Sequence, residues 1–115
     1  MHLFGLRDDW NVSALDWMVD LLHQAVLNQR PQFQKSRAAA IQSLLQLKPK
    51  LFFELGSQLI LGSIPSSWDC RYATVMCMEK MSISALDQIK TLLANAQKDA
   101  DPLVRARATL SLSNI

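Results

Sequence analysis

The chain has 115 residues, of which 50% are hydrophobic and 19% are charged, and its net charge is +2. This is the length of one ordinary domain, and the apolar content excludes disorder as its main state. No apolar run approaches the roughly 18 residues that a membrane span needs. Arg7, Asp8 and Asp9 interrupt the apolar N-terminal stretch, which argues against a secretory signal. Because Cys70 and Cys77 are also expected to stay free thiols, we predict a cytoplasmic or otherwise intracellular protein.

Turn and capping residues divide the chain into six predicted helices. Ser13 opens a sequence resembling a capping box, and the helix that follows is expected to end before Pro31. Gly62 is a predicted C-cap, and Asp101 is a predicted N-cap before Pro102 in the first helical position. The remaining helices are expected over residues 33–47, 50–61, 65–81, 84–98 and 102–115. No stretch alternates with period two for long enough to predict a strand.

Alternate helices repeat with a period of 34 residues, which separates Arg37 from Arg71 and Arg71 from Arg105. Small or aliphatic residues recur three, six, seven and ten positions after each arginine, and these offsets trace one face of a helix. We therefore predict that these columns form the core. Further columns at the same spacing align the first helix of each pair: Met18, Phe52 and Leu86; Leu21, Leu55 and Ile89; Ala25, Leu59 and Leu93. A repeat of this length with two helices is typical of a solenoid.

The last repeat resembles the second helix of a HEAT repeat. Its Asp-Pro turn at Asp101 is followed by Val104 and Arg105, then by a small residue at Ala108 and by spaced aliphatic residues. The resemblance implies an all-α fold, a short right-handed α-solenoid of three helical hairpins. The expected units are an N-terminal cap segment over residues 1–12 and repeats over about 13–48, 49–82 and 83–115.

The resemblance also implies a structural ladder of ion pairs, since the arginine of a HEAT repeat usually pairs with aspartates in the turns. Here Arg37, Arg71 and Arg105 would pair with Asp69 and Asp101. The turn of the first repeat has no aspartate and departs from the family pattern. The alternative interpretation is that these arginines contact a ligand directly.

Repeat solenoids bind partners on the face formed by their second helices. Positions one and five after each arginine should lie exposed on that face, together with the tryptophan at the start of the fourth helix. The predicted partner-binding residues are Ala38, Gln42, Tyr72, Met76, Ala106, Leu110 and Trp68. Tyr72 and Met76 lie one turn apart near the centre, where an aromatic ring and a flexible thioether suit contact with a partner. Packing against a neighbouring helix is the alternative.

Recognisable catalytic chemistry is absent from the sequence. His2 and His23 are the two histidines, neither has a second ligand at metal spacing, and three glycines form no phosphate loop. We therefore predict no catalytic residue, metal or cofactor, and we expect a non-enzymatic scaffold that binds another protein.

Two other functions are considered. A carboxylate-free stretch over residues 21–53 suggests anion or nucleic-acid binding, although a net charge of +2 counts against it. The residues that would bind the anion are Lys35, Arg37, Lys48 and Lys50. The second alternative is a solenoid segment that either associates with itself through the C-terminal edge or is cut from a longer solenoid, because Leu112 and Ile115 at that edge occupy positions of the core type.

Overall fold

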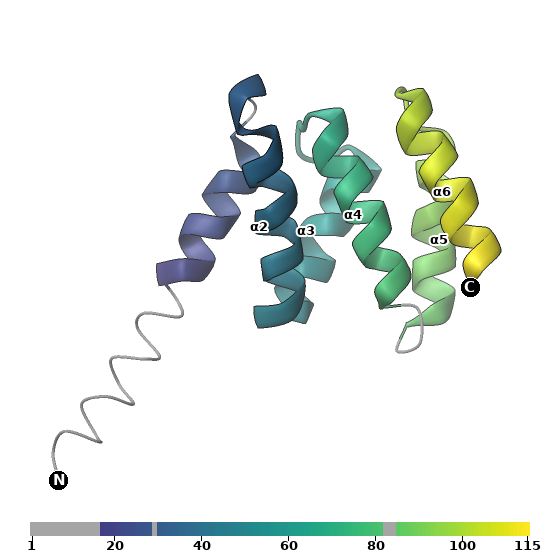
Figure 1. Cartoon of the computed structure of the whole chain (residues 1–115). Helices are drawn as coiled ribbons and strands as arrows, with labels where there is room; N and C mark the ends of the chain where they lie inside the picture. The colour runs from purple at the N-terminus through teal and green to yellow at the C-terminus, as the bar shows by residue number, and fades with distance from the viewer. Residues whose placement is uncertain (1–16, 29, 82–84) are drawn as a thin grey trace, which may run out of the picture.

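The computed structural model describes residues 17–28, 30–81 and 85–115, and over these residues the chain forms six α-helices (Figure 1). The predicted N-terminal cap segment and the predicted helix start at Ser13 lie outside the described residues. The elements are a helix over residues 17–27, the 3-10 turn η1 (Pro31–Phe33), α2 (Gln34–Leu47), α3 (Pro49–Leu61), α4 (Trp68–Lys80), α5 (Leu86–Ala96) and α6 (Pro102–Asn114).

The helices alternate in direction and pack in two layers. α2, α4 and α6 lie side by side in the layer nearest the viewer in Figure 1, and α3 and α5 pack together behind them. All three helices of the front layer begin at the same end of the molecule, at the top of the view. The predicted fold class, an all-α solenoid of three helical hairpins, is confirmed over the described residues.

The predicted helix ends follow from local backbone chemistry. Gly62 closes α3 in the left-handed conformation with φ of 80°, which a residue without Cβ adopts at low cost. Asp101 caps α6, since its Oδ1 accepts hydrogen bonds from the N–H groups of Leu103 at 2.8 Å and Val104 at 3.4 Å. Both predictions are confirmed.

Several columns of the 34-residue repeat form part of the core, but the predicted column ten positions after each arginine does not, since Leu47 is exposed and Met81 and Ile115 are half-buried. In the front layer Ala40, Thr74 and Ala108 are each at most 3% exposed. In the other layer Leu55, Leu59, Ile89 and Leu93 are buried, whereas Leu86 at the start of α5 is 42% exposed. Phe52 is 2% exposed, whereas its counterpart Met18 is 46% exposed because no described element covers that side of the first helix.

Candidate functional site

Arg37 is a buried cation that joins the turn before α2 to the start of α4. Its Nε donates to Asp69 Oδ2 at 2.7 Å, and its Nη2 donates to Asp69 Oδ1 at 3.0 Å. Its Nη1 donates to the backbone carbonyls of Asn28 at 2.7 Å and Arg30 at 2.6 Å. Both side chains of the ion pair are almost inaccessible, so this pair, assigned to the ladder from sequence, contributes to packing between repeats.

The Arg37–Asp69 pair stays ionised. Burial by itself would raise the pKa of Asp69, but hydrogen bonds from Arg37 and Ser67, with the charge of Arg37, hold that pKa below its ordinary value. The hydrogen bond to Asp69 in turn raises the pKa of Arg37. Because each charge neutralises the other, neither is available to hold a charged ligand.

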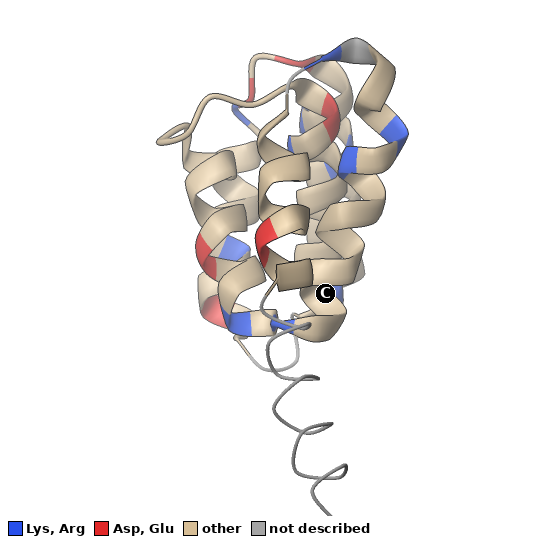
Figure 2. Ribbon diagram, turned by 90° about the vertical axis from the view of Figure 1, so that its left-hand side faces the viewer, with Lys and Arg blue, Asp and Glu red and all other residues tan. Residues whose placement is uncertain are grey.

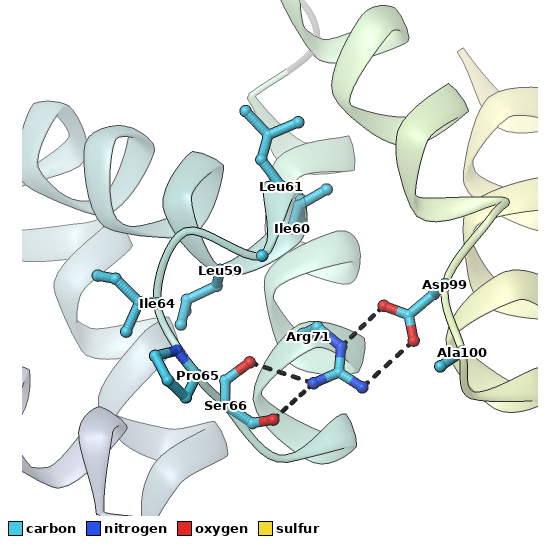
Figure 3. A pocket seen from close by; sticks show the side chains of 10 residues that line it. Leu59, Ile60, Leu61, Ile64, Pro65, Ser66, Arg71, Asp99 and Ala100 are labelled. Carbon is cyan, nitrogen blue, oxygen red and sulfur yellow. Dashed lines mark hydrogen bonds and ion pairs between the residues drawn. The ribbon is translucent and has the colours of Figure 1, made fainter.

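Arg71 repeats this arrangement with a different aspartate from the predicted one. Its Nε and Nη2 donate to Asp99 at 2.7 and 3.2 Å, and its Nη1 donates to the carbonyl and hydroxyl oxygens of Ser66 at 2.6 and 3.2 Å (Figure 3). The assignment of Asp101 to the ladder is therefore corrected. The carboxylate of Asp101 is occupied by the first N–H groups of α6, whereas Asp99, two residues earlier, faces α4.

Arg105 has no carboxylate partner within the described ranges. Its Nη1 donates to the backbone carbonyls of Asp99 at 2.8 Å and Ala100 at 3.0 Å, and its side chain is exposed. The three arginines thus differ in burial and in partners. Arg37 is buried and Arg71 is half-buried, each with a bidentate aspartate, whereas Arg105 is exposed and contacts backbone carbonyls. A shallow pocket lies beside Arg71 (Figure 3). The guanidinium group of Arg71 is already hydrogen-bonded to Asp99 and Ser66 there, so it is not free to bind a ligand.

A groove of about 400 Å³ separates α2 from α4 on the front face, and the start of α6 closes one side of it. It collects five of the seven residues predicted to bind a partner, together with five others. The lining residues are Gln34, Lys35, Ala38, Gln42, Trp68, Asp69, Tyr72, Ala73, Met76 and Leu103. The predicted residues Ala106 and Leu110 lie exposed further along α6 and do not line it.

Three of the five lining residues that were not predicted to bind a partner share one column of the repeat. Lys35, Asp69 and Leu103 each lie two positions before a repeat arginine. This is about one helical turn before the position following each arginine, which the prediction placed on the exposed face. Extending that column by one turn toward the helix start would have found all three. The groove is therefore longer than predicted and reaches the beginnings of the helices.

An aromatic pair forms the α4 wall of the groove. The rings of Trp68 and Tyr72 meet edge to face, with centroids 6.1 Å apart and an interplanar angle of 79°. Trp68, Tyr72 and Met76 are all partly buried, so they pack against the helices and also present surface to the groove. Trp68 and Tyr72 pack against the core, as the alternative interpretation expects, and contact of these side chains with a partner stays a prediction.

The basic residues predicted to form one anion site do not form a single surface. Arg37 is enclosed by its own partners, while Lys35 and Lys48 lie at opposite ends of α2, which puts their backbones roughly 20 Å apart. Lys50 follows Lys48 at that far end. Figure 2 likewise shows Lys and Arg at both ends of the helices rather than in one patch. Lys35 alone of the four lines the groove.

The described residues contain no group of three or more His, Cys, Asp or Glu side chains that would hold a metal ion. Cys70 and Cys77 are free and buried, and burial raises the pKa of both thiols. The Cys70 Sγ donates to the carbonyl of Val26 at 3.3 Å, which fixes it in the core. Among the helices that the structure describes, none is long and apolar enough to cross a membrane.

Two curated proteins are similar to this chain. The bilin biosynthesis protein CpeY of Synechococcus sp. (strain WH8020) is 32% identical over 113 residues, which cover 97% of this chain and 27% of that protein. The uncharacterized phycocyanin operon protein Y of Pseudanabaena tenuis (strain PCC 7409) is 37% identical over 89 residues, which cover 76% of this chain and 19% of that protein. The chain therefore spans about a quarter or less of these relatives. No family model and no solved structure matches.

These similarities correct the function predicted from sequence. The expectation of a generic, non-enzymatic scaffold is wrong, because a relative matched along nearly the whole chain is named for bilin biosynthesis. The alternatives of polyanion binding and self-association find no support in either name. The prediction relied on the absence of catalytic motifs. This chain matches only about a quarter of CpeY, so that absence says little about enzymatic activity.

Proposed function

We propose that this chain takes part in bilin biosynthesis as the helical-repeat part of an enzyme, that it binds a bilin in the groove between α2 and α4, and that its protein partner is a phycobiliprotein. The similarity to CpeY along 97% of the chain suggests the pigment, and the groove is the geometric observation that carries the proposal.

The groove suits the chemistry of a bilin. A bilin is an open-chain tetrapyrrole with a flat, conjugated, largely apolar skeleton and two propionate groups. Ala38, Met76 and Leu103 supply apolar surface, and the Trp68–Tyr72 pair supplies aromatic surface on which a pyrrole ring packs. A volume of about 400 Å³ lies within the range of small-molecule sites, roughly 300–1,000 Å³.

The open side of the groove leaves room for the protein partner. Exposed apolar residues continue along α6 from the groove, at Leu103, Ala106 and Leu110. A phycobiliprotein is the partner we assign to this stripe, because phycocyanin carries bilins and the second relative is named for the phycocyanin operon. A pigment held in the groove would then lie beside the protein that receives it.

Titration with a bilin tests the proposal. Biliverdin is added to the 115-residue chain, and binding is followed by the change in its absorption and by the circular dichroism that a bound bilin acquires. We expect Tyr72→Ala and Met76→Ala to weaken binding about tenfold, equivalent to about 1.4 kcal/mol. The control is Leu61→Ala, which removes a 55% exposed leucine from α3, in the other layer, and should leave binding unchanged.

Each variant is first checked for an unchanged helical spectrum and melting transition. The proposal fails if the intact chain does not bind biliverdin. It also fails if the groove variants bind as tightly as the Leu61→Ala control does.

A further inference from the structure

We infer that Lys35 sets the direction in which the bilin lies in the groove, by pairing with one of its propionate groups. The inference rests on the proposed function and adds a named residue and an orientation to it. The observation behind it is that the charge of the groove is concentrated at one end.

Two of the residues that line the groove carry a formal charge, Lys35 and Asp69. Asp69 is held by Arg37 at 2.7 Å, and the two charges cancel. Lys35 is exposed and makes no ion pair with any residue that the structure describes. When Arg37 is counted with these two residues, the charge of Lys35, located where α2 begins, is the one left without a countercharge.

Nothing close by along α2 offsets this charge. The first turn of α2 contains no acidic residue, and the N-cap residue Phe33 makes no side-chain hydrogen bond to it. The positive end of the helix dipole adds to the charge of Lys35. The corresponding positions of the other repeats hold Asp69 and Leu103, so an unpaired cation in this column occurs at the α2 end of the groove alone.

The far end of the groove is neutral. Gln42 lies seven residues after Lys35 on α2, which is roughly 10 Å along the helix, and Met76 faces the same end from α4. A ligand that has an anionic group and an uncharged body therefore meets a groove with one cationic end and one uncharged end. Such a groove favours one orientation of the ligand over the reverse.

A bilin has this polarity. Its propionates are carried by the two central rings and are ionised at neutral pH, and a lysine ammonium is a compact charge that suits a carboxylate. A propionate paired with Lys35 brings a central ring beside Trp68, since α2 and α4 begin at the same end of the molecule (Figure 1). One terminal ring then extends toward Gln42 and Met76, and the other half of the pigment remains outside the groove.

The test compares biliverdin with biliverdin dimethyl ester, in which both carboxylates are blocked. We expect Lys35→Gln to weaken biliverdin binding about two- to fivefold at about 50 mM salt, the range for one ion pair near the surface. The same variant should bind the dimethyl ester as the intact chain does. Lys35→Arg keeps the charge and should retain most of the affinity. Lys48→Gln, at the opposite end of α2, is the matched control and should change neither affinity.

The outcomes separate the inference from the proposed function. If the intact chain binds neither pigment, both are overturned. If it binds both pigments but Lys35→Gln changes neither affinity, or lowers both equally, the groove still binds a bilin and the role of Lys35 is refuted. Loss of affinity for biliverdin alone supports the inference.

Discussion

Removal of Arg37 is the perturbation whose effect on stability follows most directly from the structure. Arg37→Ala leaves the buried carboxylate of Asp69 without its countercharge, and it leaves the carbonyls of Asn28 and Arg30 without their donor. Breaking a buried ion pair by removing one partner costs about 3–5 kcal/mol. Since whole domains are stable by only about 5–15 kcal/mol, the variant should be largely destabilised.

The other two arginines provide an internal scale. Arg71 makes the same bidentate contact, with Asp99, but is 18% exposed, so Arg71→Ala should cost less, roughly 1–3 kcal/mol. Arg105 is exposed and contacts only backbone carbonyls, so Arg105→Ala should change stability by no more than about 0.5 kcal/mol. Urea unfolding followed by circular dichroism at 222 nm measures all three free energies. Equal losses, or a larger loss for Arg105→Ala than for Arg37→Ala, would refute the reasoning.

The same ion pair predicts how stability depends on pH. The pKa of Asp69 is lower in the folded state than in the unfolded chain, where it is about 3.9. The contribution of this carboxylate is therefore complete above about pH 4 and is lost as the pH falls below that value toward the lower folded-state pKa. The free energy of unfolding, measured from pH 6 to pH 3, should fall less steeply in Asp69→Asn than in the intact chain. Parallel curves would contradict the assignment.

Three further predictions concern packing, thiol reactivity and capping. A Cβ at Gly56 would lie 2.9 Å from Cγ2 of the buried Thr74. Gly56→Ala should therefore lower the unfolding free energy by about 1–3 kcal/mol, although alanine has the better helix propensity. A more stable variant would show that α4 can move to accommodate the added methyl group. Cys70 and Cys77 should react with a thiol reagent only after unfolding, and rapid reaction of the folded chain would contradict their burial. Asp101→Ala should cost about 1 kcal/mol in thermal unfolding, as expected for an N-cap, whereas no loss would show that its capping bonds contribute nothing.

The columns of the repeat predicted the interior because helix periodicity reports which face is buried. Thr74 and Ala108 are fully buried as their spacing predicts. Periodicity does not report whether a neighbouring element is present, and for this reason Met18 shares a column with Phe52 but not its burial.

The contacts within the candidate site depend on the three-dimensional course of the backbone, which the spacing of residues along the sequence does not show. Two aspartates lie within three residues of each other in the turn before α6, and only the direction of the backbone decides that Asp99 pairs with Arg71 while Asp101 caps the helix. Leu103 lines the groove from α6, which packs against α4, and residue spacing alone does not show this contact between repeats. The function was not predicted because the groove residues form no recognisable motif.

The central claim, that the groove between α2 and α4 receives a bilin, is tested most directly by two-dimensional amide NMR of the isotopically labelled chain titrated with biliverdin. The account predicts that the largest shifts fall on residues lining the groove, including Ala38, Gln42, Tyr72 and Met76, while the amides of α5 change little. Absence of shifts, or shifts concentrated on α5 or on the helix over residues 17–27, would contradict the claim.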